Sequence, residues 1–356
     1  MYCLKYKDDV VLEFDTETRT IKMINERLLP LSLVYKERNY DLVRKFCSDR
    51  ILMLNRNYCK ELLLACGIES QDDVTICIVC KGLSFRDNYW ISELGSMETW
   101  QDVNLYSNSF STLVSKVALT GDMSEITVVD DRLFTGELTN KGTRAKCFIR
   151  KKDGLYLYKN ETIPEIASEI ITYYIAQLLR LPCSKYTIER LYDKDCSVCK
   201  ILTSEQYELL PCRDVMSMYN SKMSWDSDYY RAFMQICSQN FMRMQILDYV
   251  TLNTDRNRDN FGLLRYNGNI INLYPVYDHD SCFKGKSVEA TYFPTGLSFK
   301  DTLNLLKTQY GAIYNSLSND ILKLASTVKE EPFKRLFLKY KSLEEYNAML
   351  ERISNL

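Results

Sequence analysis

The sequence contains a single histidine, His279, among its 356 residues. Catalytic sites that need a Cys–His or Ser–His pair, or several histidines around a metal ion, therefore have almost no material in this chain. The first residues lack the apolar core of a signal peptide, and no apolar run approaches the length of a membrane span. We expect a cytoplasmic protein that does not bind membranes.

An excess of charge of either sign is also absent. Lysine and arginine number 46, aspartate and glutamate number 47, and the formal net charge is -1. A nearly neutral chain has no overall field that attracts nucleic acid. Direct binding to nucleic acid is therefore not expected.

Cysteine, by contrast, is abundant, with 13 residues. Without an export signal, these are expected to be reduced thiols rather than disulfides. Two pairs have C-x-x-C spacing, Cys77 with Cys80 and Cys196 with Cys199. Both pairs stand in apolar stretches typical of β-strands, where this spacing places the two thiols on opposite faces. Packing in a core is thus favoured over a zinc site.

The length and an apolar content of 46% predict two or three domains with substantial cores. We predict an accessory or docking domain in residues 1–122, a β-rich unit in 123–212 and a helical unit in 213–356. The tryptophans of the first domain, Trp90 and Trp100, are expected in its core. Its predicted strands are residues 10–14 and 20–24, and its predicted helices are 40–46 and 58–66.

The stretch from Asn253 to Gly262 reads N-T-D-R-N-R-D-N-F-G and follows a long helical pattern. Beyond it, two apolar segments flank Asn267-Gly268, the residue pair typical of a two-residue hairpin turn. Pairing about that turn makes the numbers of facing residues sum to about 535. Three polar side chains then meet at the open end of the hairpin, namely Asp255, Asn260 and Asp278.

Two carboxylates and a carboxamide at such close range need a positive charge, because like charges repel. Hard oxygen ligands suit Mg²⁺, which takes one or two carboxylates and completes its shell with water and phosphate. A solvated turn capped by aspartate and asparagine is the alternative, and composition alone does not exclude it.

A second polar segment, Thr139 to Lys146, precedes two predicted strands joined at Asp153-Gly154. That turn predicts number sums of about 307, which would place Lys159 opposite Phe148. Lys159 continues an apolar face of the second strand and is predicted to point inward, towards an anion. A donor-rich loop beside such an ammonium group suits the phosphates of a nucleotide. A lysine that extends into water at the strand end is the alternative.

A helix is predicted from Pro164 to Leu179. Glu165 and Glu169 lie four residues apart on one side of it, and either could pair with a lysine of a neighbouring strand. A solvated acidic face is the alternative. The predicted buried stripe comprises Ile166, Ile170, Tyr173 or Tyr174, and Leu178. Later amphipathic helices are predicted at residues 298–306, 313–325 and 343–353.

The order of these residues resembles that of protein kinases, in which an aspartate stands five residues before a metal-binding asparagine and a later aspartate binds metal. The motifs are closer to those of the HipA-like serine/threonine kinases, whose signature resembles N-x-D-R-H-x-x-N-F followed by P-x-Y/F-D. This chain has N-T-D-R-N-R-D-N-F from Asn253 and P-V-Y-D from Pro275. The likeness covers residues 123–310 and is weaker over the first 120, which look like the leader domain of such proteins.

The resemblance implies an α+β fold of the bilobed protein-kinase-like type, with a β-rich N-lobe, a helical C-lobe and an extra N-terminal α+β domain. It implies ATP and Mg²⁺ as cofactors. Asp255 would orient or deprotonate the acceptor hydroxyl, and Asn260 and Asp278 would hold Mg²⁺. Lys159 would contact the α- and β-phosphates, and Glu169 would be the helix glutamate that pairs with it.

By the same resemblance, a loop would cover the phosphates and two later residues would lie near the adenine. The loop residues are Thr139, Gly142, Thr143 and Lys146, and the adenine residues are Leu202 and Thr203. HipA-like kinases can phosphorylate their own phosphate loop, for which Thr139 and Thr143 are candidates by position. Asn257 stands where the family commonly has histidine, which leaves open a slowed or inactive enzyme.

The implied activity is transfer of the γ-phosphoryl group of ATP to a serine or threonine hydroxyl of a protein substrate. One alternative is a catalytically dead kinase-like module that binds nucleotide or a partner. Another is a component of a toxin–antitoxin system with a small antitoxin-like partner. A small-molecule kinase would share the same residues.

Overall fold

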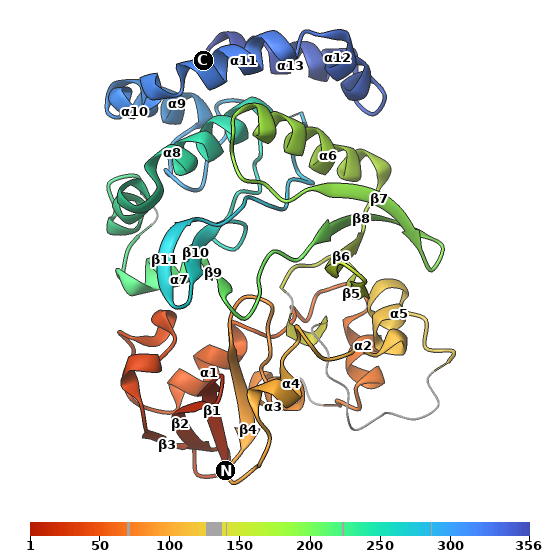
Figure 1. Cartoon of the computed structure of the whole chain (residues 1–356), viewed down its shortest axis with the longest axis vertical. Helices are drawn as coiled ribbons and strands as arrows, with labels where there is room; N and C mark the ends of the chain where they lie inside the picture. Colours follow the sequence, from red (N-terminus) through yellow and green to blue (C-terminus); the bar gives the residue numbers. More distant parts are fainter. Residues whose placement is uncertain (70–71, 126–136, 140, 223, 286) are drawn as a thin grey trace. The chain divides into compact units, whose positions relative to one another are not determined.

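The computed structural model describes residues 1–69, 72–125, 137–139, 141–222, 224–285 and 287–356 (Figure 1). The chain forms two compact units. Unit 1 contains Met1–Asn160 and Glu189–Glu208, and unit 2 contains Glu161–Ile188 and Leu209–Leu356. The predicted α+β class is confirmed, because each unit combines antiparallel strands with helices. The division at residues 122 and 212 stays a prediction.

Unit 1 begins with a four-stranded antiparallel sheet in the order β3-β2-β1-β4. Its strands are β1 (Tyr2–Tyr6), β2 (Asp9–Asp15), β3 (Thr20–Met23) and β4 (Tyr89–Glu93). The helices of this part are η1 (Glu26–Leu28), η2 (Leu31–Leu33), α1 (Asp41–Ser48), α2 (Cys59–Ala65), α3 (Asp73–Val79), α4 (Trp100–Val103) and α5 (Thr112–Thr120). The two predicted strands and two predicted helices are confirmed.

Helix α3 corrects the expectation for Cys77 and Cys80. The β-branched residues of this segment favoured a strand, but Asp72 caps a helix by accepting the Thr75 N–H at 2.9 Å. The cap outweighs the β-propensity of the short run. The Cys80 sulfur lies 3.4 Å from the Cys77 carbonyl, so the two thiols do not lie on opposite faces. All thirteen cysteines are thiols, as predicted.

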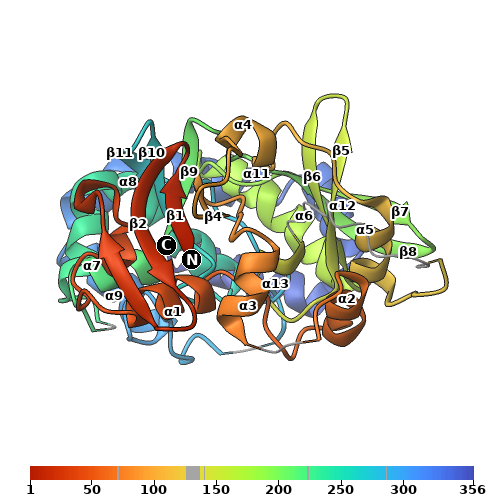
Figure 2. The same ribbon diagram turned by 90° about the horizontal axis from the view of Figure 1, so that it is seen from below.

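A second antiparallel sheet in the order β5-β6-β8-β7 follows. Its strands are β5 (Lys146–Lys151), β6 (Gly154–Asn160), β7 (Tyr186–Leu191) and β8 (Lys194–Lys200). Figure 2 shows the β5–β6 hairpin with α5 alongside. The predicted register is wrong by two residues, because residues 152–153 form the turn and Lys159 pairs with Lys146 rather than Phe148. A shift of two leaves every side chain on its predicted face.

The two sheets of unit 1 share a hydrophobic core. Trp90 and Trp100 are buried in one cluster, as predicted, together with Phe148 and Leu155 of the second sheet. The Phe85 and Phe148 ring centroids lie 4.5 Å apart. The first 120 residues therefore support the β5–β6 hairpin.

Unit 2 is mainly helical and contains the sheet β11-β10-β9. Its helices are α6 (Ile163–Leu178), α7 (Cys212–Met218), α8 (Asp228–Thr251), α9 (Phe299–Thr308), α10 (Gly311–Ser316), α11 (Ser318–Thr327), α12 (Glu331–Leu338) and α13 (Leu343–Ser354). Its strands are β9 (Tyr207–Pro211), β10 (Gly262–Tyr266) and β11 (Asn269–Leu273). Helices α9, α10, α11 and α13 pack against α6 or α8 (Figure 1). The predicted hairpin is confirmed, with Tyr266 opposite Asn269 beside the turn. A register shift between Leu264 and Arg265 places Leu263 opposite Leu273, one residue away from the predicted pairing.

The inward side of α6 is more polar than predicted. Tyr174 is exposed and Ile170 is half-buried, whereas Glu165 and Glu169 are buried. Glu165 belongs to a capping box with Thr162 at the start of the helix. The alternative of a solvated acidic face is therefore wrong. None of the helices in the described ranges is both long and apolar enough to traverse a bilayer.

Candidate active site

The loop from Asn253 to Asn260 joins α8 to β10. Helix α8 ends where Leu252 takes a left-handed conformation, with φ of 48°, and the Asn253 N–H bonds the Asp248 carbonyl at 3.0 Å. At the far end, a Cβ on Gly262 would collide with the main chain of Leu210 in β9. Only glycine lets β10 lie this close to β9.

Asp255 is held by the two carboxamides of its own loop. Asn257 Nδ2 donates to Asp255 Oδ1 at 3.1 Å, and Asn260 Nδ2 donates to Oδ2 at 3.2 Å. Asn260 Nδ2 also donates to the Asp255 carbonyl at 2.8 Å. The Asn260 nitrogen thus donates hydrogen bonds to Asp255, and the carboxamide oxygen of Asn260 is an atom of the kind that binds metal ions.

Arg256 anchors the loop to α8 through a buried ion pair. Its Nε lies 2.9 Å from Asp248 Oδ2 and its Nη2 lies 3.0 Å from Oδ1, and both side chains are 0% exposed. The Tyr292 hydroxyl also donates to Asp248 at 2.7 Å. Burial alone would lower the pKa of the Arg256 guanidinium, but the Asp248 carboxylate raises it. Arg256 therefore stays protonated and donates its full set of hydrogen bonds.

The same guanidinium holds a second segment. Arg256 Nη1 donates to the Asn260 carbonyl at 2.7 Å and to the Tyr277 carbonyl at 2.9 Å, and Nη2 lies 3.0 Å from His279 Nδ1. One buried side chain thus fixes both the Asn253–Asn260 loop and the segment that carries Asp278.

Three carboxylates gather around that segment. Ligand oxygens of Glu161, Asp278 and Asp280 all lie within 4.8 Å of one another, and Glu161 and Asp280 are buried. Three like charges at this spacing repel one another unless a cation lies among them. A set of oxygen-only ligands suits Mg²⁺. The residues present therefore fit the expected ion.

The carboxylate cluster affects the pKa of Asp255. The pKa of its carboxyl is raised, first by partial removal from water and next by the negative charge on Asp278. The hydrogen bond from Asn257 lowers it, and Asp280 raises it further. Asp255 and Asp278 were both predicted site residues, and unit 2 brings them within electrostatic reach of each other.

The backbone around Asp278 is held in a restricted conformation. Asp278 has φ of 62°, a left-handed value that aspartate tolerates better than most residues. Its N–H bonds the Tyr186 hydroxyl at 3.2 Å, and the next N–H, that of His279, bonds Glu169 Oε2 at 2.8 Å. Glu169, the expected helix glutamate, thus braces the segment that carries Asp278.

The expected phosphate loop lies in unit 1, and residue 140 falls outside the described residues. The loop follows η3 (Glu137–Thr139). Arg56 donates from Nη1 to the Glu137 carbonyl at 2.8 Å and from Nη2 to the Lys146 carbonyl at 2.5 Å. The Asn57 N–H bonds the Thr143 carbonyl at 2.9 Å. The segment before α2 therefore braces this loop.

Gly142 has φ of 106°, which favours glycine, and a Cβ there would stand 2.6 Å from Lys146 Nζ. Lys146 Nζ donates to the Lys141 carbonyl at 2.6 Å. Lys159, opposite Lys146 in the hairpin, is buried at 5% exposure, so the alternative of a lysine extended into water is wrong. Two buried lysines are therefore paired across the open end of the hairpin.

The remaining predicted residues differ in exposure. Thr143 is exposed, whereas Thr139 is buried. Leu202 is 38% exposed and Thr203 is buried, in the connection between β8 and β9.

Sequence reasoning missed Glu161 and Asp280. Each stands two residues after a predicted site residue, Lys159 and Asp278 respectively. Residues two apart share a face only in an extended chain. Glu161 lies beyond the end of β6 and Asp278 is left-handed, so this spacing gave no signal that could have found them.

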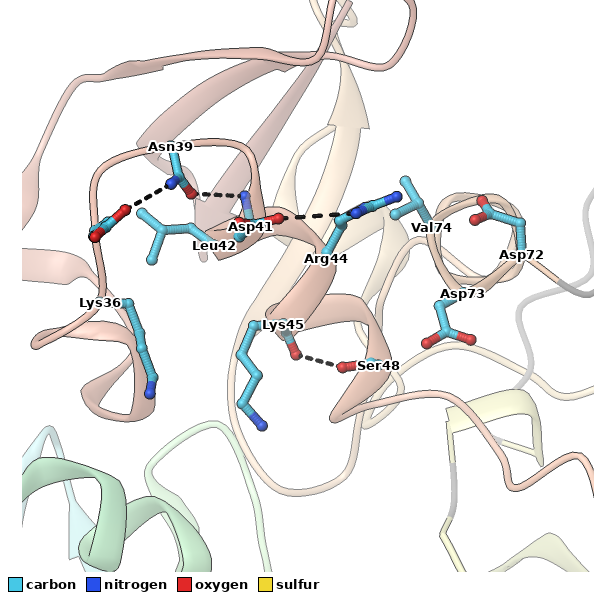
Figure 3. Close-up of a pocket in the computed structure, with 11 residues that line it drawn as sticks. Lys36, Asn39, Asp41, Leu42, Arg44, Lys45, Ser48, Asp72, Asp73 and Val74 are labelled. Carbon is cyan, nitrogen blue, oxygen red and sulfur yellow. Dashed lines mark hydrogen bonds and ion pairs between the residues drawn. The ribbon is translucent and has the colours of Figure 1, made fainter. Parts of the chain in front are cut away.

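An open pocket of about 700 Å³ in unit 1 lies beside α1 and α3 (Figure 3). Two basic residues of its lining are paired with carboxylates, because Arg44 lies 3.9 Å from Asp41 of the lining and Lys45 lies 2.7 Å from the neighbouring Asp49. The carboxylates of Asp72 and Asp73 also line it. Such a mixed lining does not favour the phosphates of a nucleotide.

No protein-family model matches this chain, and no curated protein matches it. Among solved structures, HipA of the Shewanella oneidensis MR-1 toxin–antitoxin system, solved with HipB and its operator DNA, has a TM-score of 0.60 and 11% identity, covering 100% of this chain and 97% of that chain. The Helicobacter pylori proinflammatory kinase CtkA has a TM-score of 0.43 and 15% identity, covering 61% of this chain and 88% of that chain. The full-length match confirms the expected HipA-like fold.

Proposed function

We propose that this chain, which shares the HipA fold, is an ATP- and Mg²⁺-dependent phosphotransferase that transfers the γ-phosphoryl group to a serine or threonine hydroxyl of a protein. The observation that supports it most is the gathering of Glu161, Asp278 and Asp280 in the unit that also carries Asp255. Phosphoryl transfer is catalysed mainly by positioning and by neutralising charge.

Each candidate site residue of unit 2 has a role in this proposal. The three clustered carboxylates and the Asn260 oxygen would hold Mg²⁺, which supplies charge neutralisation at the phosphates when bound. Asp255 would orient the acceptor hydroxyl and take its proton, and a raised pKa makes it a stronger base than an ordinary aspartate. Glu169 would position the Asp278 segment through the His279 N–H.

The roles in unit 1 rest on the resemblance and on burial. Lys159 would bind the α- and β-phosphates, and Lys146 with Gly142 would belong to the loop that covers them. Leu202 and Thr203 would lie near the adenine. Of the two hydroxyls proposed for self-phosphorylation, the exposed Thr143 is favoured over the buried Thr139.

A partner protein is also proposed. The neighbouring HipA was solved with HipB and operator DNA. A small antitoxin-like protein is the corresponding partner for this chain, and the net charge of -1 favours contact with DNA through that partner rather than directly.

The test is transfer of labelled phosphate from ATP, with Mg²⁺, to the chain itself and to a protein acceptor. Asp255→Asn and Asp278→Asn are expected to lower transfer on the order of 100-fold or more. Glu289→Gln, which removes an exposed carboxylate paired with Lys300, is the control and should retain transfer. Full transfer by both aspartate variants would contradict the proposal, and Mg-ATP binding without turnover would favour a catalytically dead module.

A further inference from the structure

Cys183 differs from the other cysteines in its access to solvent. Twelve of the thirteen cysteines are buried, and Cys183 is partly exposed. Buried thiols in apolar surroundings are inert, whereas an accessible thiol can react with reagents in water. Cys183 is therefore the one cysteine of this chain that is partly open to dissolved reagents.

The Cys183 sulfur lies against the single histidine of the chain. His279 Nε2 is 3.5 Å from Cys183 Sγ, and His279 Nδ1 is 3.0 Å from Arg256 Nη2. A guanidinium can only donate, so Nδ1 accepts and the neutral ring carries its proton on Nε2, directed at the sulfur. The thiolate, which is the reactive form, can accept this N–H, whereas the protonated thiol donates to the Ser184 carbonyl at 3.5 Å.

The backbone at Cys183 is joined to the segment that carries the clustered aspartates. Cys183 forms a parallel bridge with Val276. The Val276 N–H bonds the Pro182 carbonyl, and the Ser184 N–H bonds the Val276 carbonyl, both at 2.9 Å. Val276 precedes Asp278 by two residues. A group attached to the sulfur therefore stands next to the His279 ring and next to the bridge that holds this segment.

We propose that the Cys183–His279 pair is a site of reversible thiol modification that controls the Asp278 segment. A low-molecular-weight disulfide is the modifying agent. The Cys183 thiolate attacks one sulfur of the disulfide, the S–S bond breaks, and the departing thiolate takes up the proton that Cys183 lost. A reducing thiol reverses the step. The effect on phosphoryl transfer rests on the proposed function, whereas the modification and the loosening of residues 276–280 do not.

The first experiment treats the native full-length chain with oxidised glutathione and maps adducts by peptide mass spectrometry. One glutathione is expected at Cys183, and none at this position in Cys183→Ser. Cys237→Ser, which removes a buried thiol of the same unit, should be modified like the unaltered chain. Modification of another cysteine first, or none at Cys183, would overturn the proposal.

The second experiment measures amide hydrogen exchange of the modified chain. Peptides covering residues 276–282 are expected to exchange at least about tenfold faster, because the bonded N–H groups of this segment lose protection. Reduction should restore the slow rate, and treated Cys183→Ser should not change. Unaltered exchange in a fully modified chain would overturn the proposal.

Phosphoryl transfer should fall on the order of 100-fold on modification and return on reduction, since small displacements of catalytic groups have effects of that size. If neither form transfers phosphate, the proposed function fails, and the exchange rates still decide the proposal about Cys183. If both forms transfer phosphate equally, the control of activity by this thiol is wrong.

Discussion

Two buried arginines hold the two polar loops at residues 253–260 and 139–146, and they bind different partners. Arg256 in unit 2 is paired with the Asp248 carboxylate, and its pKa is raised. Arg56 in unit 1 donates to two main-chain carbonyls, and burial lowers its pKa to about 10. The first loop is held by a hydrogen-bonded charge pair, whereas the second is held through main-chain carbonyls, and the negative charge of Glu137 offsets only part of the cost of burying Arg56. The consequences of removing each should differ accordingly.

The largest effect is expected for Asp248→Asn. It leaves the Arg256 guanidinium buried without its counter-charge, which costs about 3–5 kcal/mol of unfolding free energy. Chemical denaturation measures the loss. Asp228→Asn, which removes a carboxylate 3.6 Å from Arg231 at the surface, is the control and should change stability by about 0.5 kcal/mol or less. Equal losses in the two variants would contradict the role assigned to the buried pair.

A smaller effect is expected for Arg56→Met. Two carbonyl groups lose their donors, which costs about 1–3 kcal/mol, and this is partly offset because a poorly compensated buried cation is removed. Hydrogen exchange should rise at residues 137–146 and stay unchanged at residues 253–262. A loss as large as that of Asp248→Asn would break the distinction between the two arginines.

The smallest effect is expected on the melting temperature, through the Asp255 carboxyl of the loop that Arg256 holds. The folded-state pKa of Asp255 is raised from 3.8, so the folded chain holds more protons than the unfolded chain between 3.8 and that pKa. Stability contributed by this group therefore falls as pH rises through the window. In metal-free buffer at pH 7, Asp278→Asn should lower the Asp255 pKa and raise the melting temperature by no more than about 2 °C.

NMR titration of the labelled Asp255 carboxyl carbon measures the pKa, and the difference in melting temperature should shrink below pH 4. An unchanged Asp255 titration in Asp278→Asn would show that the two carboxylates do not interact. That outcome would remove the main link between Asp255 and the carboxylate cluster.

The two hairpins show how far the sequence determines the fold. Asn267-Gly268 favours one tight turn, and the pairing of β10 with β11 follows from it as far as Arg265, where the register shifts by one residue. The turn predicted at Asp153-Gly154 lies one residue earlier, at residues 152–153, because Gly154, with φ of 146°, begins β6 instead of ending the turn. Period-2 alternation survived this error, so the inward face of Lys159 was still predicted correctly.

The candidate site was predictable where local motifs carry it and not where tertiary contacts do. The spacing within Asn253–Asn260 identified Asp255 and Asn260. Glu161 and Asp280 lack a motif of their own and become meaningful only because the fold brings them to Asp278. The prediction of the buried stripe on α6 was wrong in part for a related reason. The buried glutamates of that helix accept hydrogen bonds from main-chain donors that only the folded chain supplies.

The central claim is that three carboxylates of unit 2 hold one divalent ion. Calorimetric titration of the nucleotide-free chain with Mn²⁺, as a substitute for Mg²⁺, tests it most directly, with Glu161→Gln, Asp278→Asn and Asp280→Asn beside the Glu289→Gln control. The account predicts one bound ion in the unaltered chain and the control, and affinity lowered at least about tenfold in each of the three variants. Unchanged affinity in those variants would contradict it.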